Sequence, residues 1–330
     1  MKPIATLPLV AAAFLGFAAK ADPVTLTWSV AALENAPHGQ TIQEIAEALN
    51  ADDADELEID AHFGGTLYSQ DQQGSALQRG LIDLSLSGFQ WIGDRVPRYA
   101  MFSSGFFFRD EAHLTAVLSS PIGQEIFDDI AEQTGIRVLG AWYFGQRNIS
   151  HRDVGHPIET PADMADVSLR MPNSEAWLEL GRALGAQPTP VSIAELYLAL
   201  STGTVDAQDN PMPVTIQRRF YEVADNMVLT GHVIACNLVV MNNDSWENLS
   251  AEQQEALMAA IEAGRISQRE RVLAAEAEAR TFLEGEGVTF VEPDRSVWIE
   301  NAQTYYRESG AMDGWDMDLY ERVQAVGADG

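Results

Sequence analysis

The sequence predicts an α/β protein with a largely parallel sheet, divided into two lobes with a cleft between them. Strand-like and helix-like segments alternate along the chain, which is the pattern of repeated β-α-β units. The 330 residues suffice for about two domains at roughly 150 residues each. No short repeat, low-complexity stretch or linker divides the chain, so we expect strands and helices to cross between the lobes.

The first half of the chain follows this rhythm element by element. The strand candidates are residues 24–30 (VTLTWSV), 57–63 (LEIDAHF), 82–88 (IDLSLSG) and 137–143 (RVLGAWY). Between the first two, residues 41–49 (TIQEIAEAL) have the apolar spacing of a helix, and residues 75–81 (SALQRGL) lead into the third.

The second half of the chain repeats this alternation of strands and helices. Residues 167–170 (VSLR) favour a strand, and a helix from about Glu175 to Leu184 is followed by Gly185, which suits a left-handed helix end. Further elements are a helix in residues 194–203, a turn region in residues 206–213 (DAQDNPMP), a helix in residues 216–225, a strand in residues 228–242, a strand in residues 288–291 and a final helix opened by Pro293 and Asp294.

A very long helix is predicted to begin after Ser250 and to run to about Glu284. Ser250 and Gln253 form the pattern of a capping box. This helix and the strand around residues 233–241 are the elements expected to cross between the lobes. The expected division is a first lobe of residues 22–145 plus 235–275 and a second lobe of residues 146–234 plus 276–330.

The N-terminus has the pattern of a secretory signal. Lys2 is followed by an apolar stretch and by Ala19-Lys20-Ala21, so we expect cleavage after Ala21 and export to the periplasm. An uncleaved membrane anchor is the alternative, but Pro8 interrupts the apolar run, which is shorter than the roughly 20 residues of a spanning helix.

The charge balance excludes two classes of partner. The formal charge is −29, and removal of a signal that holds both lysines and no acid makes it −31. Such a surface repels nucleic acid and anionic membranes. Cys236 is the only cysteine, so the exported chain has no internal disulfide, and its apolar neighbours predict a small core residue.

Motifs of catalysis and cofactor binding are absent from the sequence. It contains no nucleophile elbow, zinc-protease motif, Walker loop or dinucleotide-binding glycine pattern. The six histidines show no metal-ligand spacing, and His151 and His156 are interpreted as solvated loop residues. We therefore expect neither an enzyme nor a bound cofactor or metal.

The most informative stretch is residues 170–232. It reads RMPNSEAWLELGRALGAQPTPVSIAELYLALSTGTVDAQDNPMPVTIQRRFYEVADNMVLTGH, and GAWYFGQRN (140–148) and HPIETPADM (156–164) precede it. This set of motifs closely resembles the dicarboxylate-type substrate-binding subunits of TRAP transporters, the tripartite ATP-independent periplasmic importers. The resemblance covers essentially the whole chain after the signal. It implies a two-lobed periplasmic binding protein fold with an interlobe cleft, crossing strands and a long helix that spans both lobes.

The resemblance also implies the substrate-binding residues. The family's arginine at the position of Arg170 forms a two-pronged salt bridge with the substrate carboxylate, for which a planar and permanently charged guanidinium is well suited. The alternative is a structural salt bridge with one of the many acids. Arg147 falls where the family has a second arginine, with a surface cation as its alternative. Asn210 falls where an asparagine orients the same carboxylate, and Asp-Asn-Pro is also an ordinary turn signal.

Selectivity is expected to reside in the first lobe. Gln70 and Trp91 lie where family members place ligand-facing groups, and the loop with Glu34 and Asn35 is another candidate. Polar groups such as Gln70 and Asn35 favour a hydroxy-, oxo- or sugar acid. Trp142 and Trp177 lie near the motifs, but aromatic residues on strands and helices are more commonly part of the core.

The predicted function is therefore capture of a small organic acid and its delivery to the small and large TRAP membrane subunits for uptake driven by an ion gradient. Two other binding functions stay open at this point, namely a binding protein of an ATP-driven importer and a periplasmic ligand sensor. An enzyme ranks behind both.

Overall fold

The computed structural model describes residues 23–51 and 57–327, so the expected signal at residues 1–21 lies outside the described residues. The strands are β1 (Val24–Ser29), β2 (Leu57–His62), β3 (Leu84–Ser87), β4 (Ile136–His151), β5 (Ser168–Met171), β6 (Gln187–Pro190), β7 (Ala207–Pro211), β8 (Asn226–Asn242) and β9 (Thr289–Val291). The helices are α1 (Pro37–Ala51), α2 (Gln70–Gln78), α3 (Phe89–Gly93), α4 (Glu111–Leu118), α5 (Pro121–Thr134), α6 (Glu175–Ala183), α7 (Leu196–Thr202), α8 (Met212–Gln217), α9 (Asn243–Glu247), α10 (Ala251–Gly285), α11 (Arg295–Ser309) and α12 (Met317–Ala325).

The strands form one mixed sheet. Its order is β2-β1-β3-β8-β4-β7-β5-β6, and β9 pairs with β8. The outer pairs are parallel, as predicted, but β8 pairs in antiparallel fashion with β3 and with β4, and β4 does so with β7. The expectation of a largely parallel sheet is therefore wrong at the centre, because two long strands run there in opposite directions.

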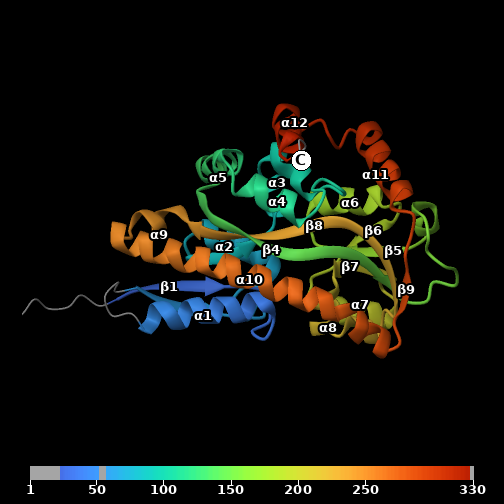
Figure 1. Cartoon of the computed structure of the whole chain (residues 1–330), viewed down its shortest axis with the longest axis horizontal. Coiled ribbons are helices and arrows are strands. Elements are labelled where there is room, and N and C mark those ends of the chain that lie inside the picture. Colours follow the sequence, from blue (N-terminus) through green and yellow to red (C-terminus); the bar gives the residue numbers. More distant parts are fainter. Residues whose placement is uncertain (1–22, 52–56, 328–330) are drawn as a thin grey trace, which may run out of the picture.

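These two long strands, β4 and β8, connect the two sides of the molecule (Figure 1). The end of β8 pairs with β3, whereas its beginning pairs with β9 and the last part of β4 pairs with β7. We call the part around β1, β2, β3, α1 and α2 the β1 side, and the part around β5, β6, β7, α6 and α8 the β5 side. The predicted crossing strand, residues 233–241, is part of β8.

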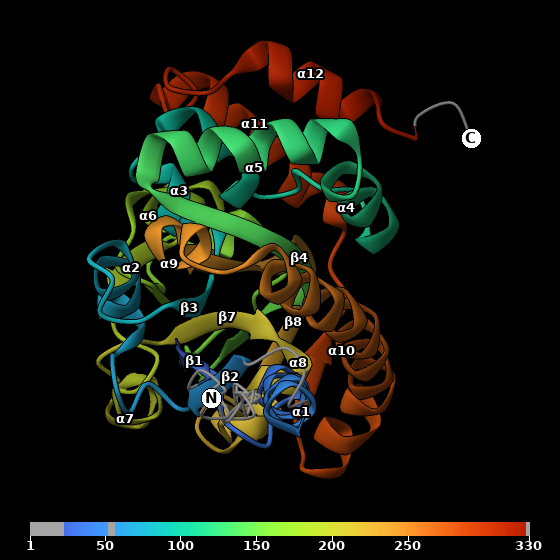
Figure 2. The ribbon, with the colours of Figure 1, turned by 90° about the vertical axis from the view of Figure 1, so that its left-hand side faces the viewer.

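The long helix α10 runs along the sheet and contacts β4, α1 and α8 (Figures 1 and 2). It begins as predicted, with the Ser250–Gln253 capping box, and extends over 35 residues. A side chain at Gly264 would meet Ile45, Trp142 and Thr41 at 3.2 Å or less. This glycine therefore lets α10 pack closely on α1 and β4.

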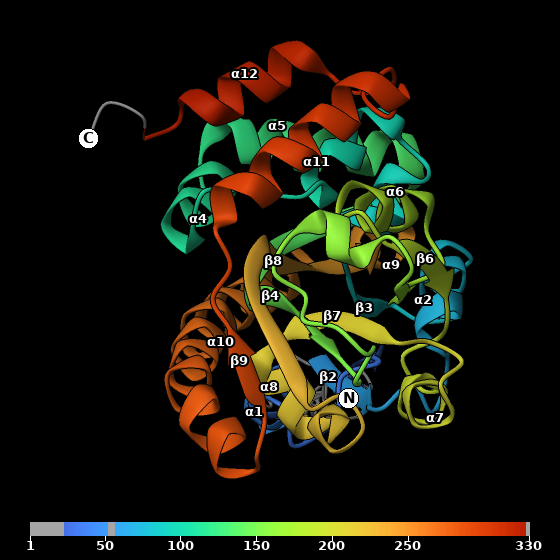
Figure 3. The same ribbon diagram turned by 90° about the vertical axis from the view of Figure 1, so that its right-hand side faces the viewer.

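Helices lie on both faces of the central strands. In Figure 1, α1, α8 and α10 lie below β4 and β8, and α4, α5, α11 and α12 lie above them. Figure 3 shows the same two layers from the side of β9 and α11. The core of the β1 side is built around Trp28 and Trp142, and that of the β5 side around Trp177 and Trp298.

Several local predictions are corrected. Residues 206–213 form β7 and the start of α8 rather than a turn, because the polar side chains of Gln208 and Asp209 find buried partners. Residues 216–225 form only the end of α8 and a short 3-10 turn at Phe220–Glu222. His151 is the buried last residue of β4 rather than a solvated loop residue. A further helix, α12, follows the one expected to be final.

Within residues 23–51 and 57–327, no helix combines the length and the apolar character needed to cross a membrane.

Candidate functional site

A cavity with a volume of about 150 Å³ lies where the two sides meet. The β1 side contributes the loop before α1, the start of α1, and residues of α2 and of the segment after β3. The β5 side contributes the ends of β5 and β7 together with α6 and α8. The polar residues in its wall are His38, Gln70, Gln73, Gln90, Arg147, Arg170, Trp177, Asn210, Gln217, Arg218, Cys236 and Asn237.

Arg170 lies at the carboxyl end of β5, one residue before its last, as the sequence predicted. Its neighbours Leu169 and Met171 are in the core, so the alternation of the strand turns Arg170 to the other face. Its side chain is held by one hydrogen bond, from Nε to the Val191 carbonyl at 2.7 Å.

The Nη2 atom of the Arg170 guanidinium is available to bind a ligand. The residue is only 2% exposed, yet its Nη2 has no hydrogen-bond partner among the described residues. Burial lowers the pKa of Arg170 to about 10, and the charge of Asp209 opposes this shift, so the group is a cation at neutral pH. A structural salt bridge, the alternative for this residue, is not formed by any described acid.

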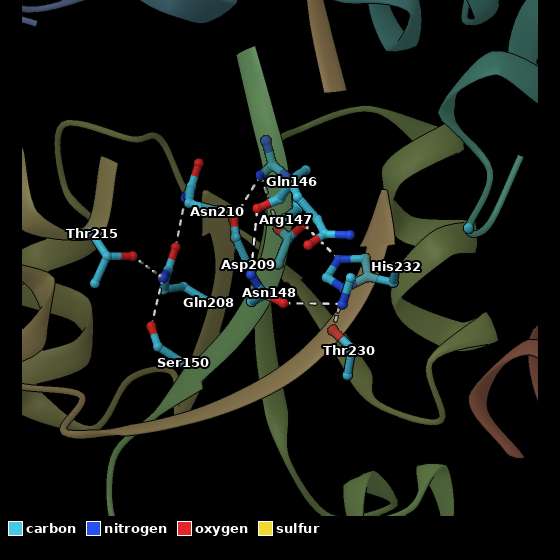
Figure 4. Close-up of polar contacts among 12 residues, drawn as sticks. Gln146, Arg147, Asn148, Ser150, Gln208, Asp209, Asn210, Thr215, Thr230 and His232 are labelled. Carbon is cyan, nitrogen blue, oxygen red and sulfur yellow. Dashed lines mark hydrogen bonds and ion pairs between the residues drawn. The ribbon is translucent and has the colours of Figure 1, made fainter. Parts of the chain in front are cut away.

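Arg147, by contrast, is already paired. Its Nε and Nη2 donate to the Asp209 carboxylate at 2.7 and 3.1 Å, and Nη2 also donates to the Asp209 carbonyl at 2.6 Å (Figure 4). The ring of Trp177 lies 4.3 Å from the guanidinium carbon. The predicted second arginine therefore lines the cavity, but most of its donors face Asp209.

Asp209 is the central residue of this buried network and was not singled out from the sequence. His232 Nε2 donates to its Oδ2 at 3.0 Å, and His232 Nδ1 lies 2.7 Å from the Thr230 hydroxyl. Burial alone would raise the pKa of Asp209, but the Arg147 charge and the His232 hydrogen bond hold that pKa well below its usual range. Burial lowers the pKa of His232, so His232 is neutral and Asp209 compensates Arg147.

Asn210 is positioned by its neighbour on the same face of β7. Its Nδ2 donates to Gln208 Oε1 at 2.6 Å, and Gln208 in turn donates to Ser150 Oγ at 2.6 Å (Figure 4). The register pairs Arg170 with Gln208, so Arg170 and Asn210 lie on one face. Both residues line the cavity, and their binding of a ligand stays a prediction.

The predicted residues of the β1 side divide into two groups. Gln70 lines the cavity, and its buried Oε1 has no partner among the described residues. Trp91 lies instead in the wall of an adjoining cavity, where Arg95 stacks on its ring at 3.6 Å. Glu34 and Asn35 are exposed and are absent from the cavity wall.

Other residues of the cavity wall were predicted from the sequence to be core residues or were not identified as candidates for the site. Trp177 packs in the core as expected, but its buried Nε1 has no partner within residues 23–51 and 57–327, and the residue also lines the cavity. Cys236 packs against the core, as expected, but it is only partly buried and also lines the cavity, and burial raises the pKa of its thiol to about 12. His38 and Arg218 had no signal beyond their residue type, because their positions depend on the packing of α1 and α8 across the cavity.

Two polar contacts join the two sides, one at this cavity and one at the adjoining cavity. Arg218 Nη2 donates to the Ala31 carbonyl at 2.9 Å. Asp94 accepts a hydrogen bond from Ser174 Oγ at 3.0 Å and further bonds from the amides of Glu175 and Ala176, so it caps α6 from the other side. Burial raises the pKa of Asp94, and these hydrogen bonds, which lower the pKa, offset only part of that shift.

The wall favours an anion. None of its residues is an acid, and the two arginines Arg170 and Arg218 form no ion pair with any described residue. Within the described ranges, no group of three or more His, Cys, Asp or Glu residues is placed to hold a metal ion. The arrangement is suited to hold a small carboxylate by charge and by free hydrogen-bonding groups.

Comparison with known proteins identifies the family. The model of the bacterial extracellular solute-binding protein family 7 matches residues 29–313. A TRAP periplasmic solute-binding protein of Roseobacter denitrificans, solved with bound 3-deoxy-D-manno-oct-2-ulosonic acid, has a TM-score of 0.88 at 33% identity over 93% of this chain and 100% of that one.

Two further proteins are similar over nearly the whole length. The sialic acid-binding periplasmic protein SiaP of Vibrio cholerae is 28% identical over 92% of each chain. A second TRAP periplasmic solute-binding protein of Roseobacter denitrificans, solved with β-D-glucuronate, has a TM-score of 0.83 at 27% identity over 92% of this chain and 100% of that one. The fold, the cavity and these similarities agree, and the chain belongs to family 7 of the bacterial extracellular solute-binding proteins, as a TRAP-type periplasmic binding protein and not an enzyme.

Proposed function

We propose that this protein captures a sugar acid or a related small hydroxy acid in the cavity between its two sides. Arg170 carries the proposal, because its buried Nη2 has no partner and its charge has no counter-ion among the described residues. A substrate carboxylate supplies both a hydrogen-bond acceptor for Nη2 and a negative charge that balances the guanidinium. The similar proteins named above bind sialic acid, β-D-glucuronate and 3-deoxy-D-manno-oct-2-ulosonic acid, all of which are carboxylates with several hydroxyl groups.

The proposed roles of the other residues follow from their geometry. Asn210 donates to or accepts from the same carboxylate, held in place through Gln208. Arg147 is fixed by Asp209 and presents its remaining donor to the ligand or to a water molecule. Gln70 Oε1 and Trp177 Nε1 are a buried acceptor and a buried donor in the same wall, neither of which has a partner in the described part of the chain, and both are suited to substrate hydroxyl groups. Trp91 acts from the adjoining cavity on a longer ligand.

The affinity is within reach of these contacts. A charge-assisted hydrogen bond contributes about 1.5–3 kcal/mol net. A two-pronged bond to Arg170 and two hydroxyl contacts therefore account for most of the roughly −8 kcal/mol of a micromolar complex.

We further propose that the β1 and β5 sides are lobes that close on the ligand, divided as residues 22–145 plus 235–275 and residues 146–234 plus 276–330. Asp94 and Arg218 supply contacts that exist only when the sides meet. The closed form then docks on small and large membrane subunits, which move the acid across the membrane with an ion gradient. Export to the periplasm with signal cleavage after Ala21 completes the proposal.

A thermal-shift screen followed by titration calorimetry tests the function. Sugar acids such as glucuronate and gluconate are compared with the corresponding neutral sugars and alditols, which lack the carboxylate. We expect at least one acid to bind at micromolar Kd and the neutral partner to bind at least about 100-fold more weakly. Equal binding of acid and neutral partner, or no binding by any organic acid, would contradict the proposal.

A further inference from the structure

Arg218 is a third arginine in the cavity wall, beside Arg147 and Arg170. Its bond between the two sides uses only part of its hydrogen-bonding capacity. It follows α8, which lies on the same side of the sheet as α1 and α10 (Figures 2 and 3). One donor, Nη2, bonds to the Ala31 carbonyl at 2.9 Å. A guanidinium has five N–H donors, and a carbonyl oxygen does not neutralise its charge.

The charges of the cavity do not balance. The charge of Asp209 acts on Arg170, but the Asp209 carboxylate is bonded to Arg147 at 2.7 and 3.1 Å. Asp71 acts on Arg170 only from the adjoining cavity. No carboxylate among the described residues offsets the burial of Arg218, and burial accordingly lowers its pKa. Arg170 and Arg218 thus contribute two positive charges to one wall.

A ligand with a single carboxylate balances only one of these charges. When Arg170 takes that carboxylate, Arg218 stays partly buried beside the ligand without a counter-ion, and an uncompensated charge in such a place is unfavourable. A second carboxylate at the far end of the ligand removes this cost. Because Arg218 is only partly buried, water screens part of its charge, and the expected gain in affinity from the second carboxylate is moderate.

We propose that Arg218 is a specificity-determining residue that favours acids with a carboxylate at both ends, such as aldarates, over the aldonates of equal length. This inference rests on the proposed function, since it assumes that Arg170 holds the first carboxylate. It differs from the ligands of the similar proteins described above, each of which is named with a monocarboxylate sugar acid.

Calorimetry with matched ligands tests the proposal on the unmodified mature protein. Gluconate and glucarate differ only in the oxidation of the last carbon, and erythronate and meso-tartrate form the same pair at a shorter length. We expect the diacid to bind about tenfold more tightly in at least one pair, with a preference that shrinks as salt is raised. Equal or weaker binding of the diacid in both pairs would overturn the inference.

The variant Arg218→Gln removes the charge, and its amide is two bonds shorter than the guanidinium, so the bond from Nη2 to the Ala31 carbonyl is lost as well. The matched ligands separate the two effects, because loss of the bridge weakens both acids of a pair and loss of the charge weakens the diacid alone. We expect the ratio of the two dissociation constants in such a pair to fall from about tenfold to about one. Arg219→Gln is the matched control, since the neighbouring Arg219 is exposed and is paired with Glu222. A parallel loss of affinity for both acids of a pair would assign Arg218 a purely structural role.

The two hypotheses fail in different ways. Aldonate binding that depends on Arg170 but shows no diacid preference leaves the proposed function intact and removes the inference. Failure of every organic acid in the screen, these four included, to bind the wild-type protein removes both.

Discussion

Replacing Asp209 with asparagine should destabilise the protein without abolishing acid binding. Asp209 is fully buried and compensates Arg147, whose guanidinium is itself almost buried. The substitution removes the charge but nearly preserves the shape, so Arg147 is left as an uncompensated cation against the ring of Trp177.

The magnitude follows from the contacts that are lost. Removal of one partner of a buried ion pair costs about 3–5 kcal/mol. The bond from Arg147 Nη2 to the residue 209 carbonyl, at 2.6 Å, survives the substitution, and the asparagine oxygen retains one acceptor. We therefore expect a loss near the lower limit, about 3 kcal/mol of the free energy of unfolding.

Ligand binding should respond differently, because a substrate carboxylate in the cavity compensates part of the released Arg147 charge. Urea unfolding with and without the tightest acid from the screen measures both effects. We expect the free variant to have a lower free energy of unfolding than the wild-type protein. Its affinity for the acid should stay within about tenfold of wild type or improve. Unchanged stability together with lost binding would show that Asp209 contacts the ligand directly and that the structural reasoning is wrong.

Two further predictions concern the Asp94 contact between the two sides and the pH dependence of stability. Asp94→Ala removes the cap that α6 receives from the other side, so acid affinity should fall about fivefold, or about 1 kcal/mol, in calorimetry. The control Asp316→Ala removes an ordinary cap of α12, and an equal affinity loss there would refute a special role for Asp94. Burial lowers the pKa of His38 from 6.5 to about 3, so between these values the unfolded chain binds a proton that the folded chain does not, and stability should fall as pH decreases below about 6.5, by up to about 1.4 kcal/mol per pH unit. His38→Gln should flatten the slope of urea-unfolding free energy between pH 6 and pH 5, and an unchanged slope would contradict the assignment.

The elements that could be predicted from sequence are those with strong local signals. The long helix begins at the predicted Ser250–Gln253 capping box. The helix after Arg170 ends at Ala183 and is followed, after Leu184, by Gly185, which adopts the positive φ of 83° that glycine tolerates. The centre of the sheet could not be predicted, because the direction in which β4 and β8 pair depends on contacts far apart in the sequence.

The site could be predicted in part for a similar reason. Arg170 and Asn210 belong to a continuous motif, and the structure places both in one wall of the cavity. Asp209 lies in the same motif, but its pairing with Arg147 arises from the register of β7 against β4, which puts the two residues on one face. The Asp-Asn-Pro signal therefore predicted a turn where the structure has the strand β7, whose Asp209 forms a buried ion pair with Arg147.

The role of Arg170 is tested most directly by calorimetry on Arg170→Ala with the acid that binds wild-type protein most tightly. The account predicts that Kd rises at least about 100-fold, corresponding to about 3 kcal/mol, in a variant that still unfolds cooperatively. A rise of tenfold or less in such a folded variant would show that the buried guanidinium does not hold the ligand carboxylate.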